Sequence, residues 1–157
     1  MTGATAVRAA GRAAAVAAVL ALGAACGGGG SASRSGGTGA TGTGPASLPL
    51  PGAGTIPTSE VTAAASQMCG IVAQSRQSPG TVLQPFYAGP HDALHLLAAV
   101  AHAHHGAEAD RLLSVMLTYE SDIAAHPPPP QTGADAQALL QAVNAALSAL
   151  GVPAPAC

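Results

Sequence analysis

Apolar and polar residues alternate with a helical period over most of the chain. From Thr58 onward, aliphatic residues recur every three or four positions, as on the buried face of an amphipathic α-helix. These stripes and their flanking residues predict four helices, over residues 59–77, 89–105, 107–125 and 133–150. Ser78-Pro79-Gly80 and the run Pro127–Pro130 separate some of them, because proline cannot continue a helix. The sequence therefore predicts an all-α fold, a small four-helix up-down bundle with short connections.

The first 57 residues do not show this period. Residues 13–22 form an apolar run that is preceded by Arg8 and Arg12 and followed by the small residues 23–25. This order of positive, apolar and small residues is typical of a secretory signal peptide, and the run is shorter than the roughly 20 residues of a membrane-spanning helix. Residues 26–57 are rich in glycine, serine, threonine and proline and predict a flexible linker without a core. The predicted parts are a signal peptide (1–25), a linker (26–57) and a helical domain (58–157).

Cys26 stands directly after the small residues, in the stretch LALGAACGGGG. This stretch resembles a bacterial lipoprotein signal, in which the cysteine after the cleavage site becomes lipid-modified. The lysine-free composition, rich in alanine, glycine and proline, also resembles that of small secreted lipoproteins of actinobacteria. The resemblance implies a protein held on the outer face of the cell membrane by a lipid on Cys26. Gly23 occupies the place where such signals usually carry leucine; the alternative is cleavage after Ala25 and free secretion.

The number of cysteines bears on the same question. The chain has three, Cys26, Cys69 and Cys157, and an odd cysteine is reactive in an oxidising compartment. If Cys26 carries the lipid, Cys69 and Cys157 remain as one pair, and we expect them to form a disulfide. That bridge would close a loop of almost the whole helical domain, which is worth about 4–5 kcal/mol in the chain-entropy model.

Charge is scarce in this chain and restricts the classes of partner. Charged residues make up 8% of the sequence, with five arginines, seven acidic residues and a net charge of −2. Nucleic-acid binding needs clustered positive charge, which the sequence lacks, so nucleic acid is not an expected partner. The expected partners are the membrane, through the lipid, and an unidentified protein of the envelope.

All six histidines lie between residues 91 and 126. On a continuous helix, His91, His95, His102 and His105 fall within an arc of about 80°. The first two and the last two form pairs about 16 Å apart, too far for one ion, so each pair would need ligands from a neighbouring helix or from a second molecule. Neutral imidazole suits Zn²⁺ or Cu²⁺. The carboxylates available to complete such sites are Asp92, Glu108, Asp110, Glu120 and Asp122.

Two hypotheses for function follow from these features. No His-Glu-x-x-His, Gly-x-Ser-x-Gly or phosphate-binding loop occurs in the sequence, so we do not expect an enzyme. The first hypothesis is a lipid-anchored helical protein with an interaction or structural role in the bacterial envelope, with the histidine stripe serving as a solvent-facing surface. The alternative is a metal-binding or metal- and pH-sensing domain that uses His91, His95, His102 and His105.

Overall fold

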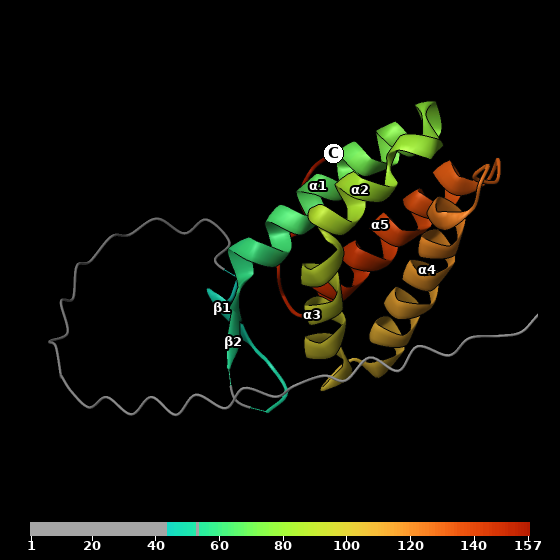
Figure 1. The fold of residues 1–157 in the computed structure, drawn as a ribbon. Coiled ribbons are helices and arrows are strands. Elements are labelled where there is room, and N and C mark those ends of the chain that lie inside the picture. The colour runs from blue at the N-terminus through green and yellow to red at the C-terminus, as the bar shows by residue number, and fades with distance from the viewer. Residues whose placement is uncertain (1–43, 53) are drawn as a thin grey trace, which may run out of the picture. The chain divides into compact units, whose positions relative to one another are not determined.

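Five α-helices and one β-hairpin form the part of the chain that the computed structural model describes, residues 44–52 and 54–157 (Figure 1). The elements are β1 (Ser47–Pro49), β2 (Thr55–Pro57), α1 (Thr58–Gln77), α2 (Leu83–Ala88), α3 (His91–His102), α4 (Gly106–Ala124) and α5 (Thr132–Ala149), with a 3₁₀ turn at Pro79–Thr81. The four long helices α1, α3, α4 and α5 confirm the predicted helical bundle. The predicted signal peptide and Cys26 lie outside the described residues.

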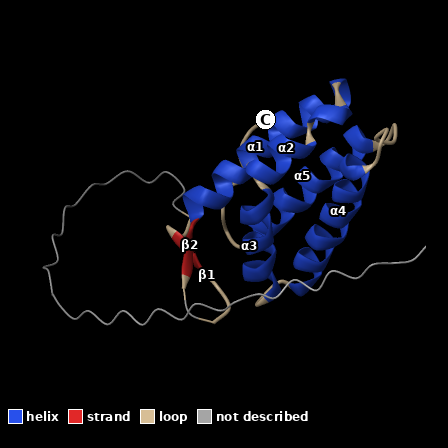
Figure 2. Ribbon diagram, viewed as in Figure 1, coloured by secondary structure: helices blue, strands red, loops and turns tan. Residues whose placement is uncertain are grey.

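The four long helices pack in a ring, in the order α1, α3, α4 and α5. Helix α4 packs against α3 and α5, and α1 packs against α5 and α3, so the bundle closes on itself. Successive long helices run in opposite directions, as the colour ramp of Figure 1 shows, and Figure 2 shows the loops that join them. This is the up-down connectivity that the short connections predict.

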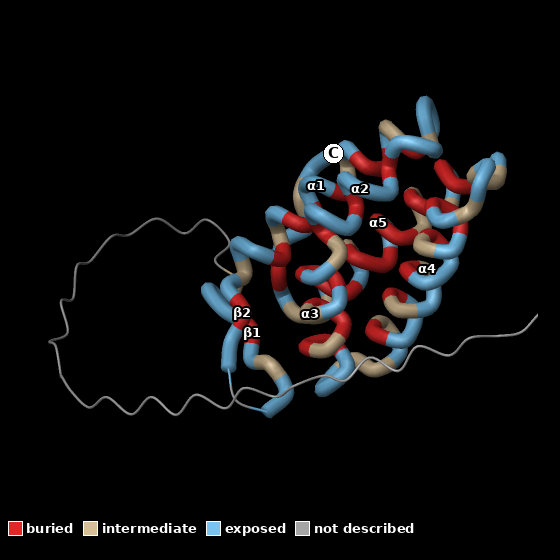
Figure 3. Tube along the Cα trace, in the orientation of Figure 1, coloured by how far each residue is buried: buried red, intermediate tan, exposed pale blue. Residues whose placement is uncertain are grey.

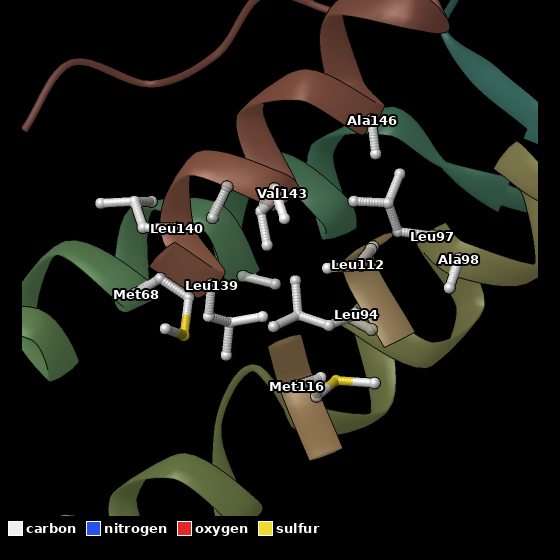
Figure 4. Close-up of a cluster of buried hydrophobic side chains, with 14 of the residues drawn as sticks. Met68, Leu94, Leu97, Ala98, Leu112, Met116, Leu139, Leu140, Val143 and Ala146 are labelled. Atoms are coloured by element: carbon white, nitrogen blue, oxygen red, sulfur yellow. The ribbon is translucent and has the colours of Figure 1, made fainter. Parts of the chain in front are cut away.

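Apolar residues on the inner face of every long helix form one core. Figure 3 shows the buried positions of each helix turned toward the others. The largest buried side chains of the bundle include Met68, Leu94, Leu97, Leu112, Met116, Leu139 and Leu147, several of which meet in Figure 4. Each such side chain contributes about 1.5–3 kcal/mol by leaving water. Fully buried alanines, among them Ala65, Ala101 and Ala136, leave room for the helix backbones to approach.

The connection between α1 and α3 is more ordered than an irregular loop. It contains the 3₁₀ turn and the short helix α2, whose Phe86 is completely buried. The Phe86 ring meets the Tyr119 ring edge-on, with centroids 5.1 Å apart. The Tyr119 hydroxyl lies 2.8 Å from the Ser75 hydroxyl, a buried hydrogen bond between α1 and α4. Burial raises the pKa of Tyr119, and the hydrogen bond from Ser75 partly opposes that rise.

The structure differs from the expected linker at strands β1 and β2, which pair as an antiparallel hairpin. Leu48 pairs with Ile56, and both side chains are buried in the common core. Gly52 occupies the left-handed region in the turn, with φ 105°, where a side chain would be strained. Two buried aliphatic residues on one face of the hairpin are enough to attach it to the bundle, although the surrounding glycine, proline and threonine residues mask that signal in the sequence.

A disulfide joins Cys69 of α1 to Cys157, with the two Cα atoms 5.5 Å apart. It confirms the predicted pairing and ties the C-terminal tail to the bundle, where Val152 is also buried. Stable disulfides form in oxidising compartments, so this bond indicates an extracytoplasmic location. Among the helices of the described residues, none combines the length and the hydropathy of a membrane span.

Candidate metal centre

Three side chains from two helices converge at one end of α3. His91 is the first residue of this helix, and His95 lies one turn later on the same face. Glu120 comes from the neighbouring helix α4. The Nε2 atom of His91 lies 3.2 Å from Nε2 of His95 and 3.1 Å from Oε1 of Glu120, while Nε2 of His95 lies 3.8 Å from the same oxygen. We refer to these three residues as the His91 cluster.

The separations within the His91 cluster match those of ligands around one zinc ion. Zinc bonds to nitrogen and oxygen are about 2.0–2.2 Å long, and two ligands at a tetrahedral angle then lie about 3.3 Å apart. The three measured separations, from 3.1 to 3.8 Å, fall around that value. A point about 2 Å from all three atoms therefore exists, which is the distance at which zinc binds nitrogen and oxygen.

The carboxylate of Glu120 carries an unsatisfied buried oxygen. Its Oε1 atom is inaccessible to water and has no hydrogen-bond partner of acceptable geometry among the described residues, although His91 Nε2 is only 3.1 Å away. A buried acceptor without a donor costs about 1–3 kcal/mol, and more when it is charged. A cation bound between this oxygen and the two imidazoles would remove that cost.

A neighbouring carboxylate orients His91. The Nδ1 atom of His91 lies 2.9 Å from Oδ1 of Asp92. When Nδ1–H donates to this carboxylate, the neutral ring presents the lone pair of Nε2 to the cluster. Carboxylate groups hold metal-bound histidines in this way in many proteins. Because Asp92 is almost fully exposed, its contribution is smaller than that of a buried partner.

Aromatic rings close one side of the cluster. The centroid of the His91 ring lies 5.6 Å from that of Phe86 and 4.7 Å from that of Tyr87. Burial raises the pKa of Tyr87, and the negative charge of Glu120 raises it further. The side chains of His91 and Glu120 are 19% and 17% exposed, whereas that of His95 is 44% exposed. Access from solvent is therefore on the side of His95.

The predicted stripe of four histidines is interrupted in the structure. Helix α3 ends at His102, three residues earlier than predicted, and His105 lies in the turn as the residue before α4. The Nδ1 atom of His102 lies 3.9 Å from Oδ1 of Asp110, and both side chains are largely exposed. His91 and His95 lie together with Glu120, whereas among the described residues neither His102 nor His105 belongs to a group of three possible metal ligands.

The sequence suggested five carboxylates as possible metal ligands. The structure identifies Glu120 as the one that lies beside His91 and His95. With three protein ligands, the cluster leaves at least one coordination position for water or another molecule, as in open zinc sites. Comparison of the chain with protein-family models, with curated proteins and with solved structures found no match. The site is therefore supported by the arrangement of its three side chains.

Proposed function

We propose that this domain binds a divalent transition-metal ion, with Zn²⁺ the best match, through His91, His95 and Glu120. The observation that carries the proposal is the convergence of two imidazole nitrogens and one unsatisfied carboxylate oxygen within 3.8 Å of one another. Two nitrogen ligands and one oxygen ligand favour Zn²⁺ or Cu²⁺ over Mg²⁺ and Ca²⁺, which take oxygen ligands. Separations close to the tetrahedral value favour Zn²⁺ over the square-planar preference of Cu²⁺.

The proposed setting of this activity is the outer face of a bacterial cell membrane. The disulfide supports an extracytoplasmic location, and the lipoprotein-like signal supports attachment through a lipid on Cys26. We propose a role in binding rather than in catalysis, with a protein of the envelope as partner. Mass spectrometry of the native protein tests the attachment: an acylated N-terminal Cys26 is the expected result, and an unmodified N-terminus contradicts it.

Metal titration of purified variants tests the site itself. We expect the wild-type protein to bind Zn²⁺ with micromolar or tighter affinity in calorimetric titrations. The double variant His91→Ala/His95→Ala is expected to lose this binding, because both nitrogen ligands are removed. The matched control is His102→Ala/His105→Ala, which removes the other two histidines of the predicted stripe and should change the affinity less than twofold.

The outcomes of this titration distinguish the two interpretations of the histidines. Equal loss of binding in both double variants would contradict the three-residue site and favour the longer stripe. Wild-type protein that binds no Zn²⁺ would leave the histidines as a solvent-facing surface. Circular dichroism of each variant establishes that the helices are intact, so that a loss of binding is not a loss of fold.

A further inference from the structure

A groove of about 350 Å³ lies beside the His91 cluster, between α3 and α4. Its walls are His95, Ala98, Ala99 and His102 of α3, Asp110 and Leu113 of α4, and Pro51 of the hairpin turn. We call it the α3–α4 groove. Its volume is within the range of pockets that hold small molecules.

His95 belongs to both the groove and the His91 cluster. The Nε2 atom of its ring faces the cluster, and the same residue forms one wall of the groove. On the far side of His91, the rings of Phe86 and Tyr87 block approach. Among the three residues of the cluster, His95 has the most exposed side chain, and it is the one that also lines the groove.

The charges of the cluster select the chemistry of a ligand in the groove. A divalent ion held by two neutral imidazoles and one carboxylate keeps a net charge of +1, which favours an anionic donor in the open position. Beyond His95, the walls are apolar at Ala98, Ala99 and Leu113. The exposed His102 and Asp110 end this apolar stretch about 10 Å from His95, taking 1.5 Å per helical residue.

We propose that the α3–α4 groove binds a small monocarboxylate with a short apolar chain, whose carboxylate takes the open position on the metal ion. This inference depends on the metal site proposed above. The carboxylate supplies the anionic donor, and the chain lies over Ala98, Ala99 and Leu113. The length of the apolar stretch favours a chain of a few carbons, and a soluble acid rather than a membrane lipid is the proposed source.

Hexanoate and acetate are the probes that test this proposal. Calorimetric titration of the Zn²⁺-loaded protein is expected to show hexanoate binding at least tenfold more tightly than acetate, because each buried methylene adds a favourable contribution. 1-Hexanol, which has the chain without the charge, is expected to bind at least tenfold more weakly than hexanoate. Removal of Zn²⁺ should abolish the preference for hexanoate over 1-hexanol.

A variant that fills the groove separates this proposal from the metal site. Ala99→Leu places a larger side chain in the groove and leaves all three proposed ligands in the sequence; because residue 99 lies one helical turn after His95, the Zn²⁺ affinity of the variant is measured as well. We expect its Zn²⁺ affinity to stay within twofold of wild type, its acetate affinity to be unchanged, and its tenfold preference for hexanoate to be lost. Ala145→Leu is the matched control, because Ala145 is exposed on α5 and lies outside the groove.

Each outcome decides between the two proposals. Equal affinities for hexanoate and acetate, or an unchanged preference in Ala99→Leu, overturn the groove proposal while Zn²⁺ binding can still stand. Wild-type protein that binds no Zn²⁺ overturns both. If Ala99→Leu does not fold, Leu113→Ala takes its place, since it removes one apolar wall; a preference for hexanoate that remains tenfold in that variant overturns the groove proposal.

Discussion

Glu120 and Asp122, two carboxylates near the C-terminal end of helix α4, face different neighbours. They differ in what can satisfy their buried oxygens. Each has a buried oxygen with no hydrogen-bond donor among the described residues. Glu120 faces two imidazoles on α3, whereas Asp122 faces Asp135 in the first turn of α5. A cation can satisfy the first oxygen, because two further ligands converge on it. Among residues 44–52 and 54–157, Asp122 and Asp135 belong to no group of three possible metal ligands, and a shared proton is the simpler solution.

The pKa of Asp122 reflects this difference. Burial raises it, and the hydrogen bond to Asp135 and the negative charge of Asp135 raise it further. Two ionised carboxylates cannot hydrogen-bond to each other, which is why Oδ2 of Asp122 lacks a donor when both are charged. One proton between them provides the missing donor. We therefore propose a metal ion for the contact between α3 and α4 and a shared proton for the contact between α4 and α5.

The largest expected difference between the two carboxylates is in their contribution to Zn²⁺ affinity. Glu120→Gln should weaken Zn²⁺ binding about 100-fold, since it removes the only anionic ligand, and this corresponds to about 2.7 kcal/mol. Asp122→Asn removes a carboxylate two residues away on the same helix and should change the affinity less than twofold. Calorimetric titration of both variants is the measurement. Similar losses in the two variants would mean that general negative charge, rather than a defined site, attracts the ion.

The second expected effect is on stability. Asp122→Asn should stabilise the fold, although it removes a buried side chain's charge. In metal-free buffer at pH 7, Asp122→Asn should raise the free energy of unfolding by about 1 kcal/mol, because the neutral amide donates a hydrogen bond to Asp135 and the repulsion between two facing carboxylates is removed. Chemical denaturation monitored by circular dichroism measures this change. Asp110→Asn, which neutralises an exposed carboxylate on the same helix, is the control for charge alone and should not stabilise. A less stable Asp122→Asn protein contradicts the shared-proton interpretation.

The same carboxylate should make the stability depend on pH. Because the pKa of Asp122 is raised in the folded state, the folded protein binds this proton more tightly than the unfolded chain does. Stability from this group is full below the ordinary aspartate pKa of 3.8 and is lost as the pH rises through the higher folded value. The stabilising effect of Asp122→Asn should therefore be largest at pH 7 and shrink as the pH falls toward 4. An effect that is constant over this range would exclude titration of Asp122 as its cause.

The helices were predictable because their signals are local. Stripes of aliphatic residues and prolines such as Pro79 and Pro127 mark the helices and their ends, and they were enough for the four long ones. The hairpin was not predicted, because Leu48 and Ile56 are isolated among glycine, proline and threonine residues. Their burial depends on contact with the rest of the core and not on a repeated local pattern.

The candidate site was only half predictable. The spacing of His91 and His95 on one helix face is a local signal, but the choice of Glu120 depends on how α3 and α4 align. The turn between α3 and α4 sets that alignment. Next to the turn, His102 lies near Asp110. Eleven residues before His102 is His91, and ten residues after Asp110 is Glu120, so these two also lie side by side. Predicting α3 to continue to His105 placed the turn too late and hid this relation.

The smallest expected effect on Zn²⁺ affinity is that of Asp92, which orients the ring of His91 and is not itself a proposed ligand. Asp92→Asn keeps the size of the side chain but replaces the anionic acceptor at Nδ1 of His91 with a weaker, neutral one. Buried partners of this kind contribute about tenfold or more to metal affinity, and solvent around the exposed Asp92 reduces that contribution, so we expect Zn²⁺ binding about threefold weaker. Calorimetric titration with Zn²⁺ measures this change. The control is Asp110→Asn, the equivalent substitution near His102, which should not change the Zn²⁺ affinity. A loss as large as that of Glu120→Gln would instead identify Asp92 as a direct ligand, which would move the ion from Nε2 to Nδ1 of His91.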